Sequence, residues 1–248
     1  MQLHLEILPE SQHKVWSLLR PVAGMGFVLY GGTAIALQLA HRQSIDFDFF
    51  SSMPLDADLL LERMSILKQA LTYKVSDNTL ILGYSAGNDT GSGLAGSVNL
   101  PMSGGNNVGS DNDYGSDIVQ LSFFGNISFG RVGHPVIDVD NGLAITSLDD
   151  LMATELAVLL KRAEKKDYID IAEMILHGVS LEKGLGSAVA IYGVTCSIQD
   201  ALAALSYFDD GDVRELSPRY KELLSQALPK VGGVYPQKIL SYSLLEDA

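Results

Sequence analysis

The chain has 248 residues, of which 47% are hydrophobic, and a formal net charge of −13. This hydrophobic content excludes a disordered chain and is enough to bury a core in one large domain or two small ones. A single cysteine excludes a disulfide framework and any multi-cysteine metal site. No apolar run approaches the roughly 20 residues of a membrane helix, and no signal-peptide pattern is present, so we expect a soluble, cytoplasmic protein with no membrane partner.

The acidic residues are unevenly distributed along the chain. Residues 75–160 hold ten carboxylates and one base, Arg131, which gives this segment a net charge of −9, whereas the other residues hold 20 acids and 16 bases. The overall charge argues against nonspecific nucleic-acid binding through a broad basic surface. Its concentration in one segment weakens that argument for the rest of the chain.

In chain order, the first part of the sequence alternates between helical and strand patterns. An apolar side followed by Pro21 predicts a short helix within residues 1–20. The short apolar run at 27–30 predicts a buried strand, and helix-forming residues follow at 33–41. The patterns then predict a strand at 44–50, an amphipathic helix at 56–71, and strands at 80–82 and 118–124.

Residues 87–116 are of low complexity, with eight glycines among many Ser, Asn and Asp residues. A segment of this composition can bury little apolar surface and loses much backbone entropy when it becomes ordered. We therefore predict a long flexible hairpin loop or insertion. A loop of about 30 residues exceeds the common range, and a functional flap is the alternative.

The last part of the chain is predicted to be helical. Ser147 and Asp150 resemble an N-terminal capping box, and a strong helix is expected at 151–163. We therefore predict an α+β domain over residues 1–146 and a helical C-terminal domain over residues 147–248. The further helices of that domain are predicted at 166–177, which Gly178 ends, and at 181–192, 197–208 and 217–228.

Five residues between positions 27 and 50 are candidates for a binding site. Gly31 and Gly32 lie where a strand turns into a helix, so the backbone can approach a phosphate and present free N–H groups, and Thr33 adds a hydroxyl. Asp46 and Asp48 are two apart on the next strand and share one face, as oxygen ligands for Mg²⁺ would. On its own, the Gly-Gly-Thr segment would be an ordinary turn, and the aspartate pair would be a solvated strand face. In this order they predict a nucleotide site.

These features resemble the nucleotidyltransferase superfamily and, more closely, the AbiEii/AbiGii toxin family. Residues 30–42 and 44–51 carry the resemblance, together with 148–162 and the Lys-Asp-x-x-Asp motif within 166–171. The resemblance covers about residues 10–180. It implies a nucleotidyltransferase-like mixed sheet with helices, dependence on Mg²⁺ and a nucleoside triphosphate (NTP) as donor. It further implies RNA, in particular tRNA, as acceptor, and a toxin of a toxin–antitoxin or abortive-infection system with a cognate antitoxin.

The resemblance also assigns roles to single residues. Gly31, Gly32 and Thr33 match the phosphate-binding turn, whereas Asp46 and Asp48 match the catalytic, metal-binding pair.

The later motif supplies three further candidates for the catalytic site. Lys166 would contact the triphosphate, and Asp167 or Asp170 would position a catalytic group. Without the resemblance, Lys166 and Asp167 would form a solvated helix start, and Asp170 would pair with Lys166 on the helix surface. His41 and Arg42 would either reach a phosphate or complement the C-terminus of the helix before them.

One position departs from the family pattern in a way that bears on activity. Relatives carry a lysine in the helix before the later motif, where this chain has Glu155. A carboxylate cannot replace an ammonium group beside a triphosphate. Either Lys161, Lys165 or Lys166 takes its place, or the site is weakened.

A second departure concerns the strand at 118–124. It offers only Gln120 and Ser122 where many nucleotidyltransferases have a third acid. The sequence therefore leaves alternatives to RNA nucleotidyl transfer open. One is a catalytically weakened nucleotidyltransferase-fold binding module, and the other is transfer to a protein or small-molecule acceptor.

Overall fold

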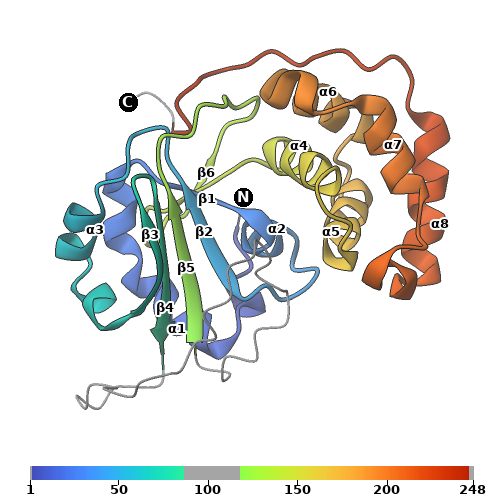
Figure 1. Cartoon of the computed structure of the whole chain (residues 1–248). Coiled ribbons are helices and arrows are strands. Elements are labelled where there is room, and N and C mark those ends of the chain that lie inside the picture. Colours follow the sequence, from blue (N-terminus) through green and yellow to red (C-terminus); the bar gives the residue numbers. More distant parts are fainter. Residues whose placement is uncertain (1, 87–117, 246–248) are drawn as a thin grey trace.

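The computed structural model describes residues 2–86 and 118–245, and a seven-stranded sheet lies at its centre (Figure 1). The strand order is β3-β4-β5-β2-β1-β7-β6. The pairs β2/β5 and β1/β7 are parallel and the other neighbours are antiparallel, so the sheet is mixed, as predicted. The strands are β1 (Val28–Tyr30), β2 (Asp46–Phe50), β3 (Leu71–Ser76), β4 (Thr79–Ser85), β5 (Ile118–Phe124), β6 (Val136–Ile137) and β7 (Ala144–Ile145).

Strand β2 places alternate side chains on opposite faces of the sheet. Phe47 and Phe49 are fully buried, and Phe47 lies against Trp16 of helix α1 (Glu10–Leu18), with 5.8 Å between the ring centroids. Asp46 and Asp48 alternate with them, face the other way and are only partly buried. The alternation predicted for residues 44–50 is therefore confirmed over Asp46–Phe50, whereas Ile45 precedes the strand and is exposed.

The helices form successive layers beside the sheet. Figure 1 shows α4 and α5 lying between the sheet and the outer helices α6, α7 and α8, whereas α3 lies on the remote side of the sheet. One continuous cluster of buried apolar side chains extends from the strands into these helices. The helices after α1 are α2 (Gly31–Leu39), α3 (Ala57–Arg63), α4 (Leu148–Leu159), α5 (Lys165–Leu176), α6 (Leu181–Tyr192), α7 (Ile198–Ser206) and α8 (Pro218–Ala227).

Serine hydroxyls fix where three of these helices begin. Ser147, Ser180 and Ser197 each accept a hydrogen bond from the backbone N–H three residues later, which satisfies one of the free donors of the first turn. The capping box predicted at Ser147 is half formed. Asp150 does not reach back to the Ser147 N–H, because its carboxylate accepts instead from the Ser147 hydroxyl and from the N–H of Gly133. Since the cap precedes Leu148, α4 begins before the predicted range of 151–163. It also ends before that range does, at Leu159.

The amphipathic helix predicted at 56–71 is wrong over its second half. Helix α3 ends at Arg63, Met64 leaves the helical conformation, and a 3-10 turn follows at Ser65–Gln69. Leu71 belongs to β3 and is exposed. Strand β3 pairs with β4 across the two-residue turn at 77–78, and this tight hairpin outweighs the local helical spacing of the leucines.

Some elements lie beyond what local patterns could predict. Strands β6 and β7 have two residues each, too few to show a period. The loop predicted at 87–116 lies outside the described residues. In residues 2–86 and 118–245, no single helix is long and apolar enough to cross a bilayer, and the pair formed by Leu181–Thr195 and Ile198–Ser206 meets that test only jointly, with a bend of 116° between its halves.

The last described segment returns from the helices to the sheet. Figure 1 shows it, in red, running from α8 back toward the strands. It passes α6, where the Gln237 N–H donates to the Gly186 carbonyl at 3.1 Å. It then forms a bridge with Arg131, which accepts from the Leu240 N–H at 2.8 Å and donates to the Ser241 carbonyl at 2.9 Å. The tail therefore links the outer helices to the sheet.

Leu244→Ala tests whether this tail contributes to the stability of the sheet. Leu244 is 1% exposed and packs with Val28, Tyr30 and Ala144. The substitution should lower the free energy of unfolding by about 2–4 kcal/mol, because it leaves a cavity in that cluster. The control is Leu240→Ala in the same tail, where the side chain is 42% exposed, and it should cost less than about 1 kcal/mol. Equal, small losses in urea denaturation would contradict the prediction.

Candidate active site

The carboxylates of Asp46 and Asp48 lie on one face of β2 between two neighbouring strands. Asp48 is opposite Tyr30 on β1 and Ser122 on β5, and Asp46 is opposite Gln120 on β5. The β5 positions thus offer an amide and a hydroxyl, as the sequence indicated. No group of three or more His, Cys, Asp or Glu side chains in the described ranges is arranged to hold a metal ion. A metal at this face would therefore have these two carboxylates as its acidic ligands.

The Gly31-Gly32-Thr33 turn lies directly beside the Asp48 carboxylate. Gly31 has a φ of +72°, which favours glycine, and a Cβ atom there would be 3.0 Å from Asp48 Oδ2. No side chain caps the N-terminus of α2, so its first-turn N–H groups have no side-chain acceptor from the N-cap. Thr33 is buried, and its hydroxyl donates to the Asp46 carbonyl at 2.5 Å. Thr33 therefore ties the turn to β2.

Burial and mutual repulsion act on the two aspartates. Burial raises the pKa of Asp46, and it raises the pKa of Asp48 to about 6 with a further contribution from the charge of Asp46. The Ser122 hydrogen bond and the charges of Arg162 and Lys166 lower the pKa of Asp48, and Lys166 also lowers that of Asp46. Positive charge from the helical part of the chain therefore acts on the pair predicted to bind metal.

The two lysines at the start of α5 have different surroundings. The side chain of Lys166 is 44% exposed, and its Nζ lies 2.9 Å from Glu164 Oε2. Lys165 donates to Glu215 Oε2 at 2.7 Å, on the side of the 3-10 turn at Gly211–Glu215. Of these two candidates to compensate for Glu155, only Lys166 has a charge that influences the aspartate pair.

Asp170 is bound to the two residues that follow the C-cap of α2. Arg42 donates to both of its carboxylate oxygens, from Nε at 2.6 Å and from Nη2 at 2.5 Å, and His41 Nε2 lies 2.7 Å from Oδ1. The predicted surface pair between Asp170 and Lys166 is therefore wrong, since Lys166 lies against Glu164 instead. Local spacing carries no signal for the observed contact, because Arg42 and Asp170 are 128 positions apart.

Glu155 and Asp167 belong to the same buried group of charges. Burial, followed by the charges of Asp170 and Asp167, raises the pKa of Glu155 well above its ordinary value, while Arg42 and Arg162 lower it. Asp167 is also buried, so a solvated helix start is wrong for this residue. Both of its oxygens lie 3.4 Å from Arg162 nitrogens, and burial raises its pKa to about 6. The cations beside Glu155 are therefore arginines.

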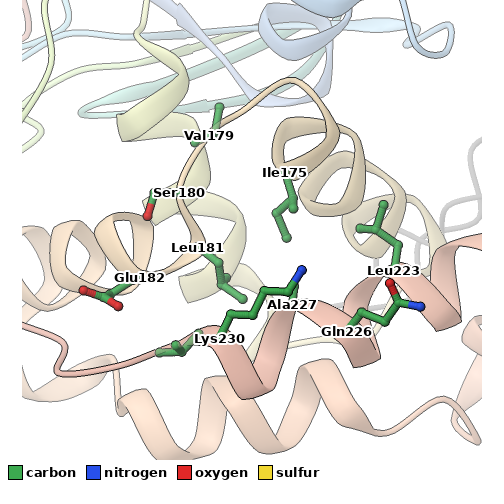
Figure 2. Close-up of a pocket in the computed structure, with 10 residues that line it drawn as sticks. Ile175, Val179, Ser180, Leu181, Glu182, Leu223, Gln226, Ala227 and Lys230 are labelled. Atoms are coloured by element: carbon green, nitrogen blue, oxygen red, sulfur yellow. The ribbon is translucent and has the colours of Figure 1, made fainter.

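A hollow of about 360 Å³ lies elsewhere in the helical part, among the end of α5, the start of α6 and α8. Figure 2 shows the side chains that line it, including Ile175, Leu181 and Leu223. None of its lining residues belongs to the aspartate pair, the glycine turn or the later motif. The hollow is thus separate from the candidate active site.

Gly31→Ala tests the close approach of the turn to Asp48. We expect a loss of about 1–2 kcal/mol in the free energy of unfolding, because alanine is strained at this positive φ and its methyl group would press on Asp48 Oδ2. The control is Gly24→Ala, where nothing lies within 4 Å and φ is not positive, and it should change stability by less than about 0.5 kcal/mol. Equal urea midpoints for the two variants would contradict this account.

Asp167→Asn tests the energetic effect of burying that carboxyl group. Its pKa is about 6 in the folded chain against an ordinary 3.8, so the folded state holds the proton more tightly than the unfolded state does. The contribution of this protonation to the free energy of unfolding is therefore complete below pH 3.8 and is lost as the pH rises through 6. At pH 7.5 the variant should be more stable than the wild type by about 1–2 kcal/mol, and the gain should shrink at pH 5. Asp200→Asn, an exposed first-turn aspartate of α7, should show no such gain. A gain independent of pH in urea denaturation would contradict the prediction.

Comparison with known protein families identifies the family to which this chain belongs. The family model described as "Nucleotidyl transferase AbiEii toxin, Type IV TA system" matches residues 17–233, which include the glycine turn, the aspartate pair and α5. The match ends before most of the returning tail. No curated protein matches the chain significantly. The predicted resemblance and the nucleotidyltransferase-like fold are therefore confirmed, and the chain belongs to the AbiEii family of nucleotidyl transferase toxins of type IV toxin–antitoxin systems.

Proposed function

We propose that this protein is an Mg²⁺-dependent nucleotidyltransferase that moves a nucleoside monophosphate from an NTP to a hydroxyl of RNA, with tRNA as the acceptor class. The observation that supports this most is the position of the Asp46–Asp48 pair beside the uncapped turn at Gly31, within the influence of Lys166. Membership of a nucleotidyl transferase family supports the reaction type.

The residues at the aspartate pair fit a divalent cation. The donors are all oxygen atoms, from the two carboxylates and the neighbouring Ser122 hydroxyl, and hard cations prefer such ligands. Neither carboxylate forms an ion pair with a residue in the described part of the chain, and Gly31 has no side chain that would cover Asp48 Oδ2. Bound there, Mg²⁺ would neutralise charge on the triphosphate and on the leaving pyrophosphate.

The chain's own groups would bind and orient the donor. The first-turn N–H groups at Gly31 and Gly32 would donate hydrogen bonds to phosphate oxygens, as helix N-termini do. Lys166 is exposed enough to contact the triphosphate. The α-phosphorus would then be held for attack by the acceptor hydroxyl, which forms the new P–O bond as pyrophosphate leaves.

The placement of charge supports an RNA acceptor. The acidic excess lies in residues 75–160, whereas Arg162 and Lys166 lie where α4 ends and α5 begins, and the charges of both act on Asp48. Each of them also forms an ion pair with Glu164. Basic groups beside a phosphate site would favour a polyanionic acceptor. We also propose that the chain consists of a nucleotidyltransferase-like part, residues 1–146, and a helical part, residues 147–248. The family also implies a cognate antitoxin.

The second candidate function is a catalytically weakened binding module, which the buried carboxyl group of Glu155 favours. Calorimetry with each NTP in the presence and absence of Mg²⁺ separates the two. An active transferase should bind one NTP in a metal-dependent way, whereas a decayed module should bind none or bind without metal.

Asp46→Asn tests the proposed function. An amide is a weaker metal ligand than a carboxylate, so the variant should lose at least about 100-fold in transfer while remaining folded. The assay incubates the protein with each α-labelled NTP, Mg²⁺ and total cellular RNA, and EDTA should stop the labelling of RNA by the wild type. Asp58→Asn, at an exposed aspartate of α3, should transfer like the wild type.

Unchanged transfer by a folded Asp46→Asn protein would contradict the assignment of the site. Label on a protein or small molecule instead of RNA would contradict the proposed acceptor alone. Growth arrest on induction of the wild type, absent with Asp46→Asn, measures the toxin role separately.

A further inference from the structure

The guanidinium of Arg42 lies against the phosphate-binding turn as well as against Asp170. A Cβ atom on Gly32 would be 2.5 Å from Arg42 Nη2, closer than Cβ atoms come to other atoms, and 3.1 Å from Ser44 Oγ. The backbone of Gly32 has no positive φ, so its conformation does not require glycine. The missing side chain at position 32 therefore makes room for the arginine.

Arg42 retains hydrogen-bonding capacity in this position. A guanidinium has five N–H donors. One on Nε and one on Nη2 bind Asp170, and one on Nη1 binds the Gln43 carbonyl at 3.0 Å. One N–H on each terminal nitrogen has no acceptor among the described residues, and the side chain is 21% exposed. A fixed arginine with two available donors beside a helix N-terminus is suited to phosphate oxygens.

Asp170 holds this arginine from the opposite side. Its side chain is 2% exposed and accepts hydrogen bonds from both Arg42 and His41, so its oxygens are occupied and shielded from a substrate. Asp170 lies on α5, whereas Arg42 follows α2. The orientation of the guanidinium beside the turn thus depends on the docking of α5 against the N-terminal part.

We propose that Arg42 binds the triphosphate of the donor and that Asp170 is a positioning residue that holds Arg42 beside the Gly31–Gly32 turn. This inference rests on the proposed function and names a specificity-determining contact of the same site. It separates Asp170 from the residues that touch substrate, and it adds to them an arginine from the chain that follows α2.

Steady-state kinetics on Arg42→Lys, Arg42→Gln and Asp170→Asn test this assignment. Each variant should raise KM for the NTP about tenfold or more and change kcat by less, because the forked contact with phosphate is lost or misaligned. Arg42→Lys keeps the positive charge and guards against a folding defect in Arg42→Gln. The double variant Arg42→Lys/Asp170→Asn should be no worse than Arg42→Lys alone, because Asp170 acts through Arg42.

Two further variants sharpen the test. Gly32→Ala should raise KM like Arg42→Lys, since the new methyl group would displace the guanidinium. Glu215→Gln removes the ion pair with Lys165, also at the start of α5, and should leave KM and kcat unchanged. Calorimetry with Mg²⁺ and the non-hydrolysable α,β-methylene analogue of the preferred NTP should show the same weakening of affinity, independently of turnover.

The outcomes distinguish this inference from the proposed function. Wild-type affinity and KM in the Arg42 variants, with only their stability reduced, would overturn the phosphate contact while leaving the proposed function intact. A large loss of kcat in Asp170→Asn at unchanged KM would make Asp170 a catalytic residue and overturn its positioning role. A wild type that neither binds the analogue nor transfers would overturn the proposed function and this inference together.

Discussion

The antiparallel pairing of β1 with β2 is the constraint on which the candidate active site depends. Its register sets Tyr30, the last residue of β1, opposite Asp48 on β2. The residue after Tyr30 must turn into α2, so Gly31 lies directly against the Asp48 carboxylate. A slip of one residue would turn both aspartates to the face occupied by Phe47 and Phe49. The hydrophobic face of β2 thus fixes the position of the polar one.

A second constraint joins the two parts of the chain. The carboxylate of Asp170 on α5 accepts hydrogen bonds from Arg42 and His41, in a region where Glu155 and Asp167 are buried as well. Breaking one partner of such a buried pair leaves an uncompensated charge, so the contact specifies how α5 packs against α2. It also brings the start of α5, with Lys166, near the aspartate pair.

The site accumulates acids that are unfavourable when ionised and buried. Burial raises the pKa values of Asp48 and Asp167 to about 6 and that of Glu155 well above its ordinary range. Structural cores avoid such groups, because each raises the free energy of the folded state. Such acids on β2, α4 and α5 are typical of a functional site, where groups needed for the reaction are kept although they lower stability.

The sequence by itself determined most of the local elements, including the strand that sets Asp46 and Asp48 on one face. Alternation around Asp46 and Asp48, the glycines after a buried strand and the serine cap at Ser147 act over a few residues, so periodicity and residue type were sufficient. Only the tertiary structure decided that Leu71 belongs to a strand, that Lys165 and Lys166 have different surroundings, and that Asp170 binds Arg42. Those outcomes depend on strand pairing or on contacts between residues far apart in the chain, which leave no signal in local spacing.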